Sequence, residues 1–344
     1  MPRSIHLQST SKGIGQGNPF SSSAVGGPIL IFLSLIAGVV LLFQNPEFAM
    51  YFEKDNVGWY VEYSQTIFHP DHAARTLYWG ESILLPLLGK VLGASKSLAS
   101  FKVFCCTIAL SLLPTLAYLS LKTFKYYWQA VLAVFIFAST FVWLKEIGIG
   151  YPDPLTALLF LIAAFARKPL VLASALALAA LSHFSMATVG SATLALLLWF
   201  SPILSSREQK QMALSALLGL GFGRLLLQLW YWKFDYLHVT GRIHWFFDRG
   251  PQFFLDLYLQ NVWGFWTKPG ILFLITYACM VMFFIYKQKF FFALSAILTM
   301  GVAYGVMFCT LDGLREFAVT IFAGYIYLLR AFVTSLSKAT PKNT

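Results

Sequence analysis

Carboxylate and imidazole groups, the usual proton-transfer and metal-binding side chains, are few in this chain and occur in short clusters. Glu53 and Asp55, separated by one residue, can hold a divalent cation such as Mg²⁺ or Mn²⁺ on an extended loop. Alternatively, one of these carboxylates can act as a general base toward an acceptor hydroxyl. A solvated stretch near lipid headgroups is the simpler interpretation of the same pair.

Asp153 lies between two prolines and offers a third carboxylate for that cation. Pro154 suits the first turn of a helix. Asp153 can therefore also be an N-cap, whose carboxylate accepts hydrogen bonds from the first N–H groups of the helix. His183 lies in a tight turn between two hydrophobic runs. It is either a structural hydrogen-bonding group or a contact for substrate.

Several basic side chains are candidates for phosphate binding, because a guanidinium group can grip phosphate through two parallel hydrogen bonds. Arg75 lies in a polar segment, and Arg315 lies just before the last hydrophobic run. Arg242 and His244 lie beside aromatic residues, which stack on sugar faces. The alternatives are a polar loop for Arg75, a surface helix facing lipid headgroups for Arg242 and His244, and an ion pair with a neighbouring acid for Arg315.

Arg224 lies near the middle of the hydrophobic run 212–232. A charge at that depth costs a few kcal/mol on insertion scales, so it needs a buried partner or an aqueous path to a lipid phosphate. Gly219, Gly221 and Gly223 precede it, and small residues at such spacing permit close packing of helices.

The composition is that of an integral membrane protein. Of its 344 residues 58% are hydrophobic and only 11% are charged, whereas a soluble domain has about 25% charged residues. The net charge of +11 does not indicate a nucleic-acid partner, because no basic cluster with interleaved aromatic residues lies on a soluble domain.

The hydrophobic runs predict an all-α, polytopic membrane helical bundle with about ten transmembrane helices. A single transmembrane domain is expected over residues 28–344, after a disordered cytoplasmic tail at 1–27. The fourth and fifth runs are short for a span of about 20 residues. The ten runs are 28–48, 101–121, 128–144, 154–166, 169–182, 187–203, 212–232, 269–286, 289–308 and 317–334.

Lys and Arg occur in every second connector, which predicts that both termini are cytoplasmic. We expect a multi-pass protein of a bacterial inner (plasma) membrane. Threading then places thirteen of the fourteen acidic residues on the outer side, all except Glu208. Two long segments, 49–100 and 233–268, also lie outside. We expect interfacial helices in both, at 56–68 and 81–93 in the first.

This order of a first span, an acid-x-acid pair and a long outer loop with interfacial helices resembles the GT-C superfamily of membrane glycosyltransferases. The aromatic residues Trp59 and Tyr60 match the aromatic position that commonly follows the acidic motif in that family. The resemblance implies that Asp55 is the catalytic acid or base, with Glu53 as a helper. It also implies that Asp153 lies near the donor phosphate or its metal, and that the reaction inverts the anomeric centre.

The resemblance further implies transfer of a sugar from a polyprenyl-phosphate or polyprenyl-diphosphate carrier to a lipid, glycan or protein acceptor at the extracytoplasmic face. Arg315 would hold the donor phosphate, with Arg75 or Arg242, and His183, His244 and Tyr60 would add substrate contacts. One alternative is a polysaccharide polymerase or ligase that uses Arg and His of segment 233–268. A non-enzymatic lipid-glycan flippase or transporter is another, although the chain shows no internal repeat.

Overall fold

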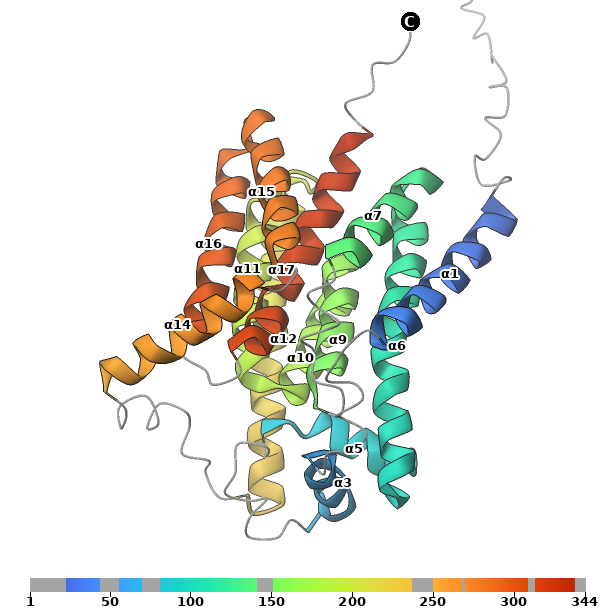
Figure 1. Cartoon of the computed structure of the whole chain (residues 1–344), viewed down its shortest axis with the longest axis vertical. Helices are drawn as coiled ribbons and strands as arrows, with labels where there is room; N and C mark the ends of the chain where they lie inside the picture. Colours follow the sequence, from blue (N-terminus) through green and yellow to red (C-terminus); the bar gives the residue numbers. More distant parts are fainter. Residues whose placement is uncertain are drawn as a thin grey trace, which may run out of the picture.

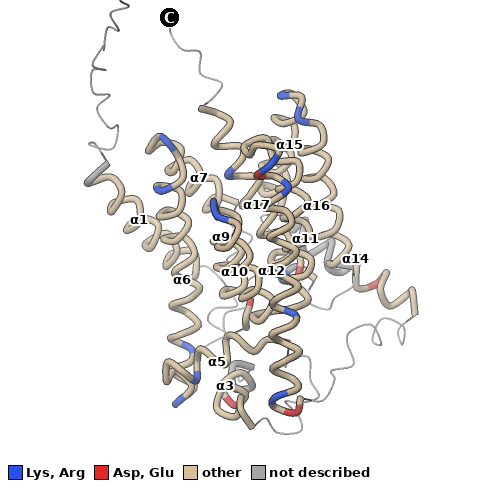
Figure 2. Tube along the Cα trace, turned by 180° about the vertical axis from the view of Figure 1, so that it is seen from behind, with Lys and Arg blue, Asp and Glu red and all other residues tan. Residues whose placement is uncertain are grey.

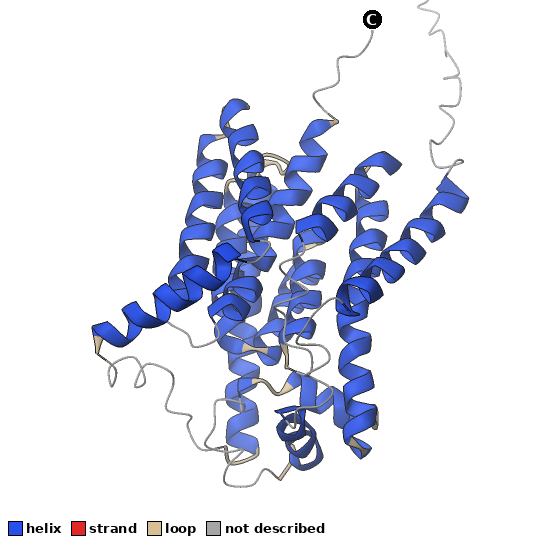
Figure 3. Cartoon of the chain, viewed as in Figure 1, coloured by secondary structure: helices blue, strands red, loops and turns tan. Residues whose placement is uncertain are grey.

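Apolar runs of this length fold as helices, because a membrane offers no water to the backbone and a helix satisfies its N–H and C=O groups internally. The computed structural model describes residues 23–43, 56–69, 81–140, 151–236, 250–267, 270–308 and 313–337. These residues form thirteen α-helices and one short 3-10 helix, and no strand occurs among them (Figure 3). The predicted all-α class is confirmed for this part of the chain.

Five helices are long and apolar enough to cross a membrane, which agrees with a membrane-embedded protein. The first of them begins at Ser23, so residues 23–27, which were expected in a disordered tail, belong to a helix. The five are α1 (Ser23–Phe43), α6 (Leu98–Thr123), α12 (Ser206–Lys233), α16 (Phe290–Phe308) and α17 (Gly313–Leu336).

The other five predicted runs also contain one helix each, but these helices are shorter than a full span. At about 1.5 Å per residue, the thirteen residues of α9 reach about 20 Å, less than the roughly 30 Å of a hydrocarbon core. The prediction of ten helical segments therefore holds, whereas ten complete spans are not established. The five shorter helices are α7 (Tyr127–Thr140), α9 (Asp153–Phe165), α10 (Pro169–Ser182), α11 (Phe184–Trp199) and α15 (Gly270–Tyr286).

The two ends of the bundle are built differently (Figure 1). At the lower end in that view, α6 and α12 extend past α9, α10 and α11, and the helices α3 (Asn56–Thr66) and α5 (Leu84–Val91) lie there. We call this the α3–α5 end. The first residues of α1 and the last residues of α17 lie at the opposite end, which we call the terminal end. A further helix, α14 (Pro251–Thr267), runs obliquely beside α16.

Arginines at the terminal end satisfy the last carbonyl groups of two helices. Arg167 Nη2 donates to the carbonyl oxygens of Lys122 (3.0 Å) and Thr123 (2.9 Å) at the end of α6. Arg330 Nη1 donates to the carbonyl oxygen of Ala164 (2.7 Å) at the end of α9. These carbonyls lack partners within their own helices and carry partial negative charge, so the guanidinium groups stabilise both helix ends.

Acidic residues lie mainly in the middle of the bundle and at the α3–α5 end, whereas Lys and Arg occur at both ends (Figure 2). Among the described acids, only Glu208 lies at the terminal end, where its Oε2 accepts from the backbone N–H of Ser205 (2.8 Å) and completes a capping box. The others lie in α3, before α5, in the first turns of α9 and α17, after α12 and in α14: Glu62, Glu81, Asp153, Glu316, Asp235 and Asp256.

The interfacial segments predicted at 56–68 and 81–93 do form helices, α3 and α5. Ser64 Oγ of α3 donates to the carbonyl oxygen of Pro86 in α5 (2.7 Å). The Tyr236 hydroxyl, just past α12, lies 3.0 Å from the hydroxyl of Tyr63 in α3. Burial raises the pKa of Tyr63 well above its usual value, so this hydroxyl stays protonated and hydrogen-bonded. Helix α3 is thus fixed both to α5 and to the end of α12.

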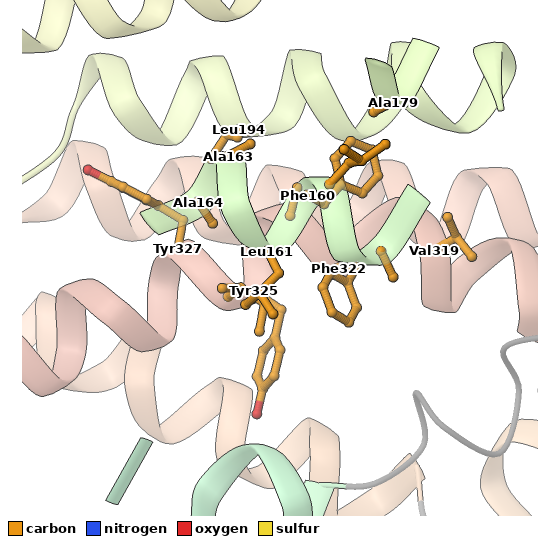
Figure 4. Close-up of a cluster of buried hydrophobic side chains, with 14 of the residues drawn as sticks. Phe160, Leu161, Ala163, Ala164, Ala179, Leu194, Val319, Phe322, Tyr325 and Tyr327 are labelled. Atoms are coloured by element: carbon orange, nitrogen blue, oxygen red, sulfur yellow. The ribbon is translucent and has the colours of Figure 1, made fainter. Parts of the chain in front are cut away.

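Helix α17 lies at the centre of the core, and most of its residues are buried. Phe160 and Leu161 of α9 lie beside Phe322 and Tyr325 of α17 (Figure 4). The buried Tyr325 hydroxyl lies 2.9 Å from the hydroxyl of Thr140 in α7, so the one polar atom of this ring is satisfied. These contacts fix α17, including its first turn, relative to α9.

Helices α10 and α12 approach each other closely at two of the three glycines noted in the sequence. A methyl group placed on Gly223 would lie 2.6 Å from both the Ala177 carbonyl oxygen and the Ala180 Cβ. Gly219 faces the backbone of Ala173 just as tightly. Gly221 has nothing within 4 Å of the same position. The predicted close packing is confirmed for Gly219 and Gly223 and is wrong for Gly221.

This difference predicts opposite effects of the same substitution two residues apart. Gly223→Ala should lower the free energy of unfolding by about 1–3 kcal/mol, because the added methyl overpacks a backbone contact. Gly221→Ala is the matched control and should be neutral or stabilising by up to about 1 kcal/mol. Thermal unfolding of the purified proteins in one detergent compares the two. Equal melting temperatures for the two variants would contradict the contact.

Candidate functional site

Asp153 is the first residue of α9 and is almost completely buried. The N-cap position is occupied by Pro152, which makes no side-chain capping bond. The interpretation of Asp153 as an N-cap is therefore wrong. Its carboxylate instead reaches the guanidinium group of Arg315, with 3.4 Å between Oδ2 and Nε. A carboxylate in the first turn still benefits from the partial positive charge of the helix N-terminus.

Arg315 and Glu316 lie in the first turn of α17, next to the start of α9. Arg315 Nη2 is 3.6 Å from Glu316 Oε1, so one guanidinium group faces two carboxylates. The exposed fraction is 16% for the Arg315 side chain, 2% for Asp153 and 3% for Glu316. These charges are enclosed by the bundle, with Arg315 the most accessible of the three.

One tyrosine ring packs on the guanidinium group of Arg315, and a second tyrosine ring packs on the first. The Cζ of Arg315 lies 4.6 Å from the ring centroid of Tyr151, a cation–π contact. The ring of Tyr60, from α3, meets Tyr151 edge to face at 5.8 Å between centroids. A continuous line of contacts thus joins α3 to the first turn of α17. Tyr60, a predicted substrate contact, is therefore separated from the charged group by one ring, that of Tyr151.

His183 occupies the turn between α10 and α11 and is buried. Its Nδ1 lies 3.3 Å from the hydroxyl of Ser185. The preceding Ser182 hydroxyl accepts from Thr156 Oγ1 at 2.9 Å and lies 3.3 Å from the carbonyl oxygen of Pro152. The turn that carries His183 is therefore held against the first turn of α9.

The first turn of α11 also contacts α17, at the end of the second turn of that helix. Thr320 Oγ1 donates to the backbone carbonyl of Glu316 and lies 3.9 Å from Met186 Sδ in α11. Three helices therefore begin close together, and each presents a partially positive N-terminus to the same region. These termini favour the negative charge of Asp153 and Glu316 in a place where water is scarce.

The electrostatic balance of the cluster limits its chemistry. Asp153, Glu316 and Arg315 together carry one net negative charge when all are ionised. Ion-paired hydrogen bonds between nitrogen and oxygen are usually about 2.7–2.9 Å long, so the contacts at 3.4 and 3.6 Å are loose. Arg315 is also the most exposed of the three side chains, at 16%, so it is the group that an incoming phosphate would meet first. Either carboxylate can accept a proton or contribute to binding a cation.

A divalent cation would need more ligands than this cluster supplies. In the part of the chain that the structure describes, no group of three or more His, Cys, Asp or Glu side chains could hold a metal ion. Glu53 and Asp55, the other two predicted ligands, lie outside the described residues. Of the three predicted ligands, only Asp153 lies among the described residues, and its carboxylate contacts Arg315.

The structure brings four of the predicted site residues into one region: Asp153, Arg315, Tyr60 and His183. The remaining predicted residues, Glu53, Asp55, Arg75, Arg242 and His244, lie outside the described residues. The ion pair of Arg315 with a neighbouring acid, the alternative interpretation of that residue, is confirmed by Glu316. One participant was missed: Tyr151, which precedes Asp153 by two residues. No family model, curated protein or solved structure matches the chain.

The contact between Asp153 and Arg315 predicts strong energetic coupling. Asp153→Asn and Arg315→Gln should each destabilise the fold, because each leaves the other buried charge without this partner. Removing both should cost less than the sum of the two, with a coupling of about 0.5–3 kcal/mol in unfolding free energy. A double-mutant cycle on purified protein measures this. Arg315→Gln combined with Glu62→Gln, an exposed acid of α3, should be additive; additivity in the test cycle would contradict the contact.

Proposed function

We propose that this chain is a membrane glycosyltransferase of the GT-C type, which moves a sugar from a polyprenyl-phosphate or polyprenyl-diphosphate carrier to an acceptor hydroxyl. The observation that carries the proposal is the enclosed cluster of Arg315 with Asp153 and Glu316 against Tyr151. It combines a phosphate-binding group, two carboxylates and an aromatic ring, which are the groups needed for a sugar phosphate.

The position of the cluster favours a lipid-borne substrate over a soluble one. It lies within a bundle of apolar helices, at the first turns of α9 and α17. Helices α3 and α5 lie at the same end of the bundle (Figure 1). A sugar on a polyprenyl carrier would keep its chain in the membrane and bring only its phosphate and sugar to this depth. By the positive-inside rule, that end faces the extracytoplasmic side.

In the proposed reaction Asp55 is the general base. Its carboxylate takes the proton of the acceptor hydroxyl while that oxygen attacks the anomeric carbon. The bond between the anomeric carbon and the phosphate oxygen breaks on the opposite face, and its electron pair leaves with the phosphate. The configuration inverts. Asp55 directly precedes α3, whose Tyr60 contacts the site through Tyr151.

Arg315 would stabilise the negative charge that develops on the departing phosphate. Before substrate binds, its own charge is balanced by Asp153 and Glu316 at 3.4 and 3.6 Å. A bidentate phosphate would take over this role at shorter distances and with stronger hydrogen bonds. Arg75, Arg242, His183 and His244 remain additional candidates for donor contacts.

The experiment is transfer by the purified protein in liposomes, with polyprenyl-phosphate and polyprenyl-diphosphate carriers loaded with radiolabelled hexoses or pentoses. Covalent products are identified by mass spectrometry. Asp55→Asn should reduce transfer by about 10²–10⁴-fold, the usual contribution of a general base. Arg315→Gln should reduce it as well, since the leaving group loses its counter-charge.

Matched controls are Glu62→Gln on α3 and Asp256→Asn on α14. Both acids are exposed, and both are expected on the outer side of the membrane, as Asp55 is. Both should retain transfer. Near-normal transfer by Asp55→Asn would overturn the assignment of the base. Movement of labelled carrier across the bilayer with no covalent product would replace the transferase by a flippase. Loss of transfer only in Arg242→Ala or His244→Ala would favour the polymerase or ligase alternative.

A further inference from the structure

Arg224 is a second guanidinium group near this region, and its surroundings differ from those of Arg315. Its Cζ lies 4.4 Å from the ring centroid of Phe184, the first residue of α11. With the Gln228 amide oriented so that its oxygen faces the guanidinium, Oε1 accepts from Arg224 Nη2 at 2.7 Å and Nε at 3.2 Å. No carboxylate of the described residues forms an ion pair with Arg224.

Two other arginines enclosed by the bundle face carboxylates or backbone carbonyls, although the Nε of Arg330 makes no hydrogen bond among the described residues. Arg315 faces two carboxylates, and Arg330 donates to backbone carbonyls at the end of α9. Arg224 donates to one neutral amide oxygen only, which occupies two of its five N–H groups. The remaining three have no hydrogen-bond acceptor among the described side chains and carbonyls.

Arg224 also lies closer to the membrane boundary than its position in the hydrophobic run suggested. Helix α12 begins at Ser206 and ends at Lys233, so Arg224 is about 21 Å beyond Lys210 along the helix axis. A hydrocarbon core about 30 Å thick whose boundary is set at Lys210 would end about 9 Å beyond Arg224, at the α3–α5 end. Gln228, one turn farther along α12 toward this boundary, provides the amide that contacts the guanidinium.

One flank of Arg224 borders the surface that faces lipid. Leu217 and Leu225 of α12 are each about half exposed, and Gly221 between them is exposed too, as expected for residues against acyl chains. Arg224 itself is half-buried between this apolar stripe and Phe184. A lipid lying along α12 could therefore place its headgroup beside the guanidinium while its chains cover the stripe.

We propose that Arg224 is a binding site for the phosphate group of a membrane lipid whose chains lie along the Leu217–Gly221–Leu225 face of α12. A cation at this depth costs several kcal/mol unless it is compensated. The compensating anion available from the bilayer is a lipid phosphate, which a guanidinium binds through two hydrogen bonds. Two lipids share this chemistry, a bulk anionic phospholipid and a polyprenyl phosphate. The site does not depend on the proposed sugar transfer.

The test is lipid binding to the purified full chain in a neutral detergent, followed by native mass spectrometry and by thermal stabilisation. The probes are dioleoyl phosphatidate and undecaprenyl phosphate, with dioleoylglycerol and inorganic phosphate as controls. Wild-type protein should bind both phospholipid probes and neither control. Arg224→Gln should weaken binding about 10–100-fold, as expected for loss of a charged hydrogen-bonded pair. Arg224→Lys should fall between the two.

Arg207→Gln, in the exposed first turn at the opposite end of α12, is the matched control and should bind as wild type does. Unchanged affinity in Arg224→Gln would overturn the site, as would equally tight binding of inorganic phosphate. Tighter binding of undecaprenyl phosphate than of phosphatidate would identify a polyprenyl phosphate as the occupant. Equal binding of the two would identify a bulk phospholipid. Arg224→Gln removes a charge from a membrane helix, so its melting temperature without lipid should not fall.

Discussion

The contact between Arg315 and Asp153 fixes the relative position of α9 and α17, and the other contacts of the site follow from it. Neither charge can be left alone at this depth without a penalty of several kcal/mol. A shift of α17 by one turn would move Arg315 about 5.4 Å from its partner. The pairing therefore selects one register, and in this register Tyr151 lies against the guanidinium and Tyr60 of α3 lies against Tyr151.

A second arginine of α17 acts on the other end of the same helix. Arg315 and Arg330 are fifteen residues apart, or about 22 Å along a helix. Helix α9 is about 20 Å long. Arg330 contacts backbone carbonyls at its C-terminal end, and Arg315 contacts Asp153 at its N-terminal end. The shortness of α9 is thus matched to the spacing of two charges on α17. It is also what brings Asp153 into the interior rather than to the membrane surface.

Hydropathy predicted the ten apolar helices and the helical character of α3 and α5, because composition and periodicity are local properties. It could not predict which helices are short, since helix ends depend on backbone conformation and on contacts with distant segments. The N-cap alternative for Asp153 failed for the same reason: Pro152 takes that position only in the folded backbone. The pairing of Asp153 with Arg315 joins residues 162 positions apart, which no spacing within one segment reveals.

The two arginines near the α3–α5 end differ in the charge around them, and this difference separates their roles. Arg315 is compensated by Asp153 and Glu316, so a phosphate that approaches it must also meet two negative groups. That environment is poor for tight ground-state binding and suits a charge that develops only as a bond to phosphate breaks. Arg224 meets a neutral amide and an aromatic ring, and it borders the lipid-facing surface. A lipid phosphate is therefore held best at Arg224, whereas chemistry on it is favoured at Arg315.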